Sequence, residues 1–221
     1  MIVTRMDDPL IAFLGDAINP HAAPLIIAAF EQDDLGNPVS NRTKGVHLSQ
    51  IIHHIYVRLH GKELEESIDA DDLRTKHGRM VVGMAWEHVL SWGLAKVFPS
   101  STIISIGELQ KDNIWMTPDR IDMENWIVDE FKATWRSTRR AATPEMLKQN
   151  FDYWIWQVMA YCYVLGTNFG RITVLFVNGD YSYSKEDGGP QIWRWSLQFT
   201  DKDLESNWLM LIRVGREIGL L

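Results

Sequence analysis

Residues 117–132 read TPDRIDMENWIVDEFK, and this stretch decides the fold of the chain. A short apolar run leads into a Pro-Asp step that ends at Asp119, and a second apolar run leads to Glu130. Residues 123–125, between the two runs, have the polar, Asn-containing composition of a tight connection. The stretch therefore predicts two adjacent strands joined by a short turn.

The charged side chains of these two strands are placed to converge. Residues two apart in a strand point to the same face, so Glu130 and Lys132 project together while Phe131 turns into the core. If the preceding strand pairs alongside, Asp119 approaches them from the neighbouring position. Two carboxylates beside an ammonium suit phosphodiester chemistry, because Mg²⁺ binds one or two carboxylates together with water and substrate phosphate. Acids and lysines also alternate on ordinary exposed strands, so both interpretations stay open for these residues alone.

The composition predicts one folded domain over residues 1–221 in a reducing compartment. Hydrophobic residues make up 46% of the chain and charged residues 23%, as in globular domains of this length. No apolar run approaches the ~20 residues needed to cross a bilayer, and residues 1–20 lack the regions of a secretory signal. The single cysteine, Cys162, excludes a disulfide within one chain. We expect no membrane partner and a cytoplasmic location, in the host cell if a phage encodes the chain.

The net charge of −7 argues against a general basic surface that binds any polyanion. It does not exclude a nuclease, because positive charge can be local and a bound metal offsets acids. Residues 133–140 form the clearly basic loop of the chain, directly after the acids. The loop contains Trp135, Arg136, Arg139 and Arg140, which suit contacts with a nucleic-acid backbone and its bases. An ordinary solvated loop is the alternative.

The spacing of hydrophobic residues predicts further helices and strands before and after the central strands. It predicts helices at residues 46–61, 80–98 and 143–165, and a final helix behind a capping box of Thr200 and Asp203. Strands are predicted at residues 100–107, 171–178 and 192–199, the last with one solvated face. Residues 1–45 are expected to form an N-terminal helical extension to a core over about residues 46–200. Together these elements predict an α/β (α+β) fold with a central sheet and flanking helices.

Two of the predicted helices carry polar residues in apolar surroundings. Glu87 lies at the edge of an apolar surface and needs a partner if it is buried, and Gly83 permits close approach of another backbone. Gln157 and Tyr161 are four residues apart, so their polar tips project together. A surface acid at Glu87 and a glutamine satisfied at a packing interface at Gln157 are the ordinary alternatives.

In chain order, these residues resemble the motif set of the PD-(D/E)xK nucleases. The matching motifs are Gly83-x3-Glu87, Pro118-Asp119, Glu130-x-Lys132 and Gln157-x3-Tyr161. The match is best to the branch of phage recombination exonucleases and RecB-type nuclease domains, and it covers about residues 46–180. Each motif is weak alone, whereas four in the same order on suitable elements form a fairly specific signal. The resemblance implies a restriction-endonuclease-like core with a mixed central sheet flanked by helices.

The resemblance also implies a role for each matching residue. Metal ligands for Mg²⁺ or Mn²⁺ would come from Asp119, Glu130, the Phe131 carbonyl and Glu87, the last directly or through water. Lys132 would orient or deprotonate the attacking water and steady charge on the phosphate. Gln157 and Tyr161 would position Lys132 and the nucleic-acid backbone. The implied activity is metal-dependent hydrolysis of DNA from an end, in phage-type recombination or end processing.

Several alternatives remain within this interpretation. Asp122, preceded by an Arg-Ile pair, competes with Asp119 as the metal aspartate, and Pro118 favours Asp119. The cysteine cluster of the iron–sulfur RecB-type members is absent, and Cys162 cannot replace it. A structure-selective endonuclease and a non-catalytic nucleic-acid-binding member are the other functions. The resemblance further allows a homo-oligomer and a single-strand annealing or recombination partner protein.

Overall fold

Residues 117–132 contribute two paired strands to a six-stranded mixed sheet. The computed structural model describes residues 1–6, 44–61, 86, 89, 103–180 and 190–221. The sheet has the order β1-β9-β8-β7-β6-β3; β7 and β8 run parallel, and the other neighbours run antiparallel. Its strands are β1 (Ile2–Met6), β3 (Ile103–Ile104), β6 (Arg120–Asp122), β7 (Ile127–Thr134), β8 (Phe169–Phe176) and β9 (Gln191–Gln198).

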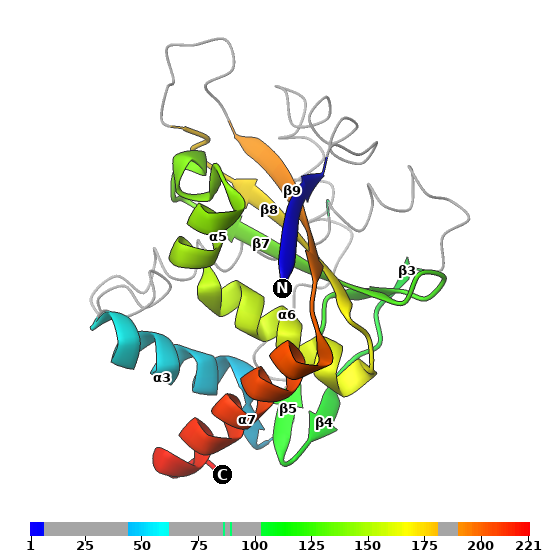
Figure 1. Cartoon of the computed structure of the whole chain (residues 1–221), viewed down its shortest axis with the longest axis vertical. Helices are drawn as coiled ribbons and strands as arrows, with labels where there is room; N and C mark the ends of the chain where they lie inside the picture. Colours follow the sequence, from blue (N-terminus) through cyan, green and yellow to red (C-terminus); the bar gives the residue numbers. More distant parts are fainter. Residues whose placement is uncertain (7–43, 62–85, 87–88, 90–102, 181–189) are drawn as a thin grey trace.

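Helices pack on this sheet and on one another. They are α3 (Leu48–His60), the short 3-10 helix η1 (Thr138–Ala141), α5 (Pro144–Asn150), α6 (Asp152–Leu165) and α7 (Asp201–Glu217). Helix α6 packs on β7 and β8, and α3 and α7 pack on α6 (Figure 1). Val128, Ile172 and Val158 are fully buried between the sheet and α6. The expected fold class, a mixed central sheet flanked by helices, is confirmed.

The β6–β7 hairpin confirms the tight connection and the strand that carries Glu130. The strand predicted to end at Asp119 is wrong: its apolar run is β5 (Ile114–Met116) of a second, three-stranded sheet, and β6 begins after Asp119. Arg120 pairs with Asp129 and Asp122 with Ile127, leaving residues 123–126 as the turn. The Asp122 carboxylate accepts hydrogen bonds from the backbone and side-chain nitrogens of Asn125, both at 3.1 Å. This local Asp-Asn bonding is the turn chemistry that the sequence indicated.

The residues before this hairpin form a second, smaller sheet. Strand β4 (Leu109–Lys111) and β5 (Ile114–Met116) form a hairpin, and β2 (Val46–His47) pairs parallel with β5. Asp112 and Asn113 at its tip have φ values of 49° and 63°. Asp and Asn tolerate this left-handed region, which a two-residue hairpin turn requires at both positions.

The predicted helix at residues 143–165 is wrong as a single helix. Thr143 caps α5, accepting from the Met146 amide at 3.2 Å, and Gly166 ends α6 at φ 68°. Between the two helices, Phe151 adopts φ −138° and ψ 32°. The Arg136 guanidinium donates to the Asn150 carbonyl at 3.0 Å, so a tertiary contact satisfies a carbonyl at the break.

Other predicted boundaries also change. Residues 2–6 of the expected helical extension instead form β1 and pair with β9, because β9 offers a free backbone edge that a distant segment can fill. Helix α3 begins at Leu48, and the two residues before it, predicted as helical, form β2 instead. Strand β9 does not have a fully solvated face, since Arg194 is 2% exposed. The strand predicted at residues 100–107 is described only as β3.

Much of the predicted helix at residues 80–98 lies outside the described residues, including Gly83 and Glu87. Within it, Trp86 and Val89 are helical and buried. Across the described part of the chain, no helix combines the length and apolar content required to cross a membrane.

Candidate active site

Asp119 lies beside the Glu130 segment of β7, at the point where β6 begins. The pairing of Arg120 with Asp129 continues in register to place Asp119 opposite Glu130. The Asp119 Oδ2 atom accepts a hydrogen bond from the Phe131 amide at 2.6 Å. Because the N–H and C=O of one strand residue point to the same side, the Phe131 carbonyl also faces Asp119. Two carboxylates and one carbonyl oxygen are therefore gathered at one strand end.

Glu130 and Lys132 project together from β7, as the two-residue period predicts. The Lys132 Nζ atom donates to Glu130 Oε1 at 2.6 Å. The Glu130 side chain is 2% exposed and the Lys132 side chain 18%, so this ion pair lies largely out of water. A partly buried charge-assisted bond holds its geometry more firmly than a surface pair.

Gln157 and Tyr161, one turn apart on α6, extend this pair into a chain of hydrogen bonds. Lys132 Nζ donates to Gln157 Oε1 at 2.9 Å. Gln157 Nε2 then donates to Tyr161 Oη at 2.6 Å. Tyr161 Oη donates in turn to the Thr117 carbonyl at 3.2 Å. The chain links β7, α6 and the segment that carries Asp119.

The donor and acceptor types give this chain a single direction. An ammonium can only donate, so the amide oxygen of Gln157 must face Lys132 and its NH₂ group must face Tyr161. The Tyr161 hydroxyl, having accepted, donates to a backbone carbonyl, which can only accept. We call this series from Lys132 to the Thr117 carbonyl the positioning chain.

Asp122 lies in a different environment from Asp119. Its carboxylate accepts from Asn125 and from Arg171 Nη2, the latter at 3.0 Å. Burial pushes its pKa upward, but hydrogen bonds from Asn125 and the Arg171 charge outweigh burial and leave the pKa below its usual value. Asp122 is thus an ionised carboxylate that is paired with Arg171 and holds the turn. Asp119 instead accepts from the Phe131 amide, next to Glu130.

The oxygen donors suit a hard divalent cation. Mg²⁺ is typically held by one or two carboxylates, with water and phosphate completing the shell, and Asp119 with Glu130 provides that number. Within the described residues, no group of three His, Cys, Asp or Glu side chains is arranged to hold a metal. Glu87, the third carboxylate implied by the resemblance, lies outside the described residues.

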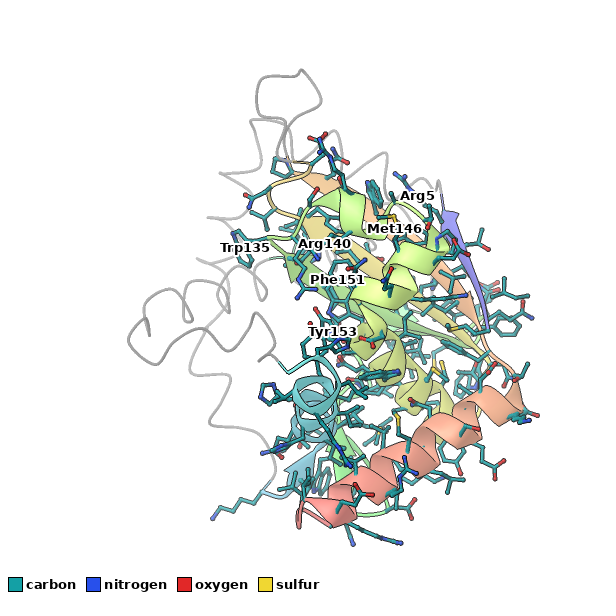
Figure 2. The ribbon with its side chains drawn as sticks, turned by 60° about the vertical axis from the view of Figure 1, so that its left-hand side comes forward. Arg5, Trp135, Arg140, Met146, Phe151 and Tyr153 are labelled. Atoms are coloured by element: carbon teal, nitrogen blue, oxygen red, sulfur yellow. The ribbon has the colours of Figure 1, made fainter. Side chains whose placement is uncertain are left out.

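The basic loop divides into an internal part and a surface part. Arg136 is used within the protein: besides bonding Asn150, its guanidinium donates to Tyr56 Oη at 3.4 Å and lies 5.5 Å from the Phe151 ring. The Arg139 side chain is 71% exposed and lies 3.6 Å from Asp180, and Arg140 is exposed. Trp135 projects outward at the edge of the described structure (Figure 2).

Two contributors to the site were not predicted. The Thr117 carbonyl ends the positioning chain, and Arg171 binds Asp122 and Asp129 beneath the site. A backbone carbonyl leaves no mark in the sequence, and Arg171 reads there as an ordinary strand residue. The motif Gln157-x3-Tyr161 was the available signal for the first of these contacts, since its hydroxyl needs an acceptor.

Comparison with known proteins gives distant structural likeness. No family model and no curated protein matches the chain. An alkaline exonuclease (LHK-Exo) from Laribacter hongkongensis has a TM-score of 0.47 and 13% identity, over 78% of this chain and 87% of that chain. A phage-related exonuclease from Haemophilus somnus 129PT has a TM-score of 0.44 and 10% identity, over 77% and 79%.

A third solved structure, of the protein SSO0001, has a TM-score of 0.42 and 12% identity, over 87% of this chain and 85% of that chain. Because these TM-scores and identities are low, the proposal below depends on the geometry of the site and not on the likenesses.

Proposed function

We propose that this chain is a Mg²⁺- or Mn²⁺-dependent deoxyribonuclease of the PD-(D/E)xK type. The observation that supports the proposal most strongly is the convergence of Asp119, Glu130 and Lys132, with Lys132 held by Gln157. Carboxylates for a cation and a fixed ammonium beside them are the groups that phosphodiester hydrolysis requires. The motif resemblance, which comes from the sequence alone, names the same residues.

In this proposal, Asp119, Glu130 and the Phe131 carbonyl hold the cation, and Glu87 is a further ligand from outside the described residues. When bound, the cation supplies Lewis-acid activation of water and neutralises charge on the phosphate. Lys132 orients the attacking water and stabilises charge that develops on the phosphate oxygens. Gln157 fixes the direction of the lysine side chain, and Tyr161 fixes Gln157.

DNA is the proposed substrate, and the surface part of the basic loop is its proposed contact. Arg139 and Arg140 are exposed, so their guanidinium groups are available to phosphates. Trp135 offers an aromatic face for a base. Arg136 was also predicted as a DNA contact and that role stays untested, but its internal hydrogen bonds make it the weakest of the four.

The resemblance favours an exonuclease that serves phage-type recombination or DNA end processing. A cleavage assay separates this form from the alternatives. Linear duplex, linear single-stranded and covalently closed DNA are incubated with Mg²⁺ and with Mn²⁺. We expect degradation of linear DNA and none of closed circles. Nicking of closed circles would instead indicate the endonuclease alternative.

Two variants and a matched control test the site itself. Glu130→Gln and Lys132→Met should each lower the cleavage rate by about 10²–10⁴-fold, the usual contribution of a positioned catalytic group. Lys202→Met removes the same charge from an exposed position on α7 and should cleave like the wild type. A wild-type protein that is inert on all three substrates, or a Lys132→Met variant with normal activity, would refute the proposal.

A further inference from the structure

A cluster of four charged side chains lies on the face of the sheet opposite to α6. One comes from each of four consecutive strands: Asp122 from β6, Asp129 from β7, Arg171 from β8 and Arg194 from β9. Asp129 must face away from Glu130, because neighbouring strand residues point to opposite faces. We call these four residues the ionic ladder.

Arg171 connects the two acids of the ladder. Its Nε and Nη2 atoms donate to the two oxygens of Asp129 at 2.8 and 2.5 Å, a bidentate arrangement. The same Nη2 donates to Asp122 Oδ2 at 3.0 Å, across β7. Arg194 Nη2 donates to Asp129 Oδ1 at 3.2 Å. Arg171 is thus the member that ties β6 to β7 and β8.

The ladder is buried, so stability alone is a weak reason for its presence. Asp129 is fully buried, Arg194 is 2% exposed, and the Arg171 side chain is 13% exposed. The free energy needed to remove such charges from water offsets much of their mutual attraction. Well-packed apolar residues in their place often give equal or greater stability. What a bidentate guanidinium adds is fixed geometry between its partners.

That geometry matters because the backbone pairing of β6 with β7 is short. Three residue pairs, from Arg120 to Asp122, set their register, and Asp119 immediately precedes the first of them. Asp129, the main partner of Arg171, immediately precedes Glu130. From the opposite face of the sheet, the ladder therefore holds β6 against β7, next to the positions of Asp119 and Glu130.

We propose that Arg171 is a positioning residue that sets the spacing of the Asp119 and Glu130 carboxylates for a divalent cation. The inference rests on the proposed function, since it concerns the same cation. Groups that hydrogen-bond metal ligands directly typically change metal affinity by about 10–100-fold when they are altered. Arg171 acts one residue further back, through Asp122 and Asp129, so loss of its fork should weaken cation binding by about tenfold, the lower end of that range, without any change in the ligands themselves.

The test compares Arg171→Lys with Arg194→Lys. Both keep a positive charge beside Asp129, but a lysine ammonium cannot reproduce the fork that joins Asp122 and Asp129. Binding of Mn²⁺ in the absence of DNA is measured by the loss of the free-ion paramagnetic resonance signal, on proteins whose near-ultraviolet circular dichroism shows an intact fold. Arg171→Lys should bind about tenfold more weakly than the wild type, and Arg194→Lys within about twofold.

A second readout needs no metal. The Phe131 amide, bonded to Asp119, should exchange its hydrogen faster in Arg171→Lys than in Arg194→Lys if the spacing of β6 and β7 has loosened. Unchanged Mn²⁺ affinity and unchanged Phe131 exchange in folded Arg171→Lys would overturn the inference while leaving the proposed function intact. A wild-type protein that binds no Mn²⁺ would overturn the proposed function and this inference together.

Discussion

Tyr161→Phe tests the positioning chain with the smallest available change. The substitution removes one oxygen and keeps the buried ring, which is 2% exposed, so the change in packing is limited to a single atom. The lost hydroxyl accepts from Gln157 at 2.6 Å and donates to the Thr117 carbonyl at 3.2 Å. Removal of the hydroxyl leaves the Gln157 amide without this acceptor. The variant also loses the hydrogen bond from α6 to the segment before Asp119.

The expected cost follows from these two bonds. A typical intramolecular hydrogen bond contributes about 0.5–1.5 kcal/mol net, so the free energy of unfolding should fall by about 1–3 kcal/mol. If Lys132 is positioned through Gln157, the loosened lysine should also lower kcat. A misplacement of the order of 1 Å can cost about 100-fold in rate. The change in KM should be smaller, because the altered group does not contact substrate.

Urea unfolding followed by tryptophan fluorescence measures the first effect, and initial rates on linear duplex DNA measure the second. Tyr163→Phe is the matched control on the same helix, since the Tyr163 ring stacks on Trp208 and under Lys111, away from the chain. It should change the rate little. A Tyr161→Phe variant that loses stability but keeps the wild-type kcat would refute the positional role of the chain and leave Tyr161 a structural residue.

Three further predictions concern the fold. Gly170→Ala should lower the free energy of unfolding by about 1–3 kcal/mol in a thermal or urea melt, because its new Cβ would collide with Val158 beneath the buried strand. The pKa of Asp203 is lowered to about 2 from 3.8, mainly by the Thr200 amide, with help from the Met1 amino group and the Thr200 hydroxyl. Its stabilising contribution should therefore be complete above about pH 3.8 and disappear as the pH falls through about 2, so wild type and Asp203→Asn should converge in acid unfolding curves. The Cys162 thiol is fully buried, and burial raises its pKa far above the usual value, so a thiol reagent should modify it only at the rate of unfolding.

The local parts of the site were predictable from the sequence. A strand alternates its faces, which places Glu130 with Lys132, and a helix brings residues four apart together, which pairs Gln157 with Tyr161. Both pairings are confirmed by side-chain hydrogen bonds in the structure. The β6–β7 turn was likewise predictable, because Asp and Asn bond within their own turn.

What the sequence could not provide depends on contacts between distant residues. The break at Phe151 lies in a segment with good helical spacing, and the Arg136 bond to Asn150 spans fourteen residues. Alternation along residues 192–199 predicted one solvated face, whereas Arg194 on that face pairs in the interior with Asp129, sixty-five residues away. Strand β1 needs β9 to complete its hydrogen bonds, so five residues at the start of the chain carried too little signal.

The alternation of β7 explains why one short strand can serve both faces of the sheet. Asp129 turns toward two arginines and Glu130 toward Lys132, so each carboxylate has a cation on its own side. A shift of one residue would exchange the two faces: Lys132 would move among the arginines, and Phe131 would replace a charged group at the site. The first change would place a third positive charge beside two largely buried arginines, and the second would put an apolar ring where a cation ligand is needed; burying like charges together is far more costly than the loss of a backbone bond. The pattern DEFK therefore specifies its own register, and the same register brings Asp119 opposite Glu130.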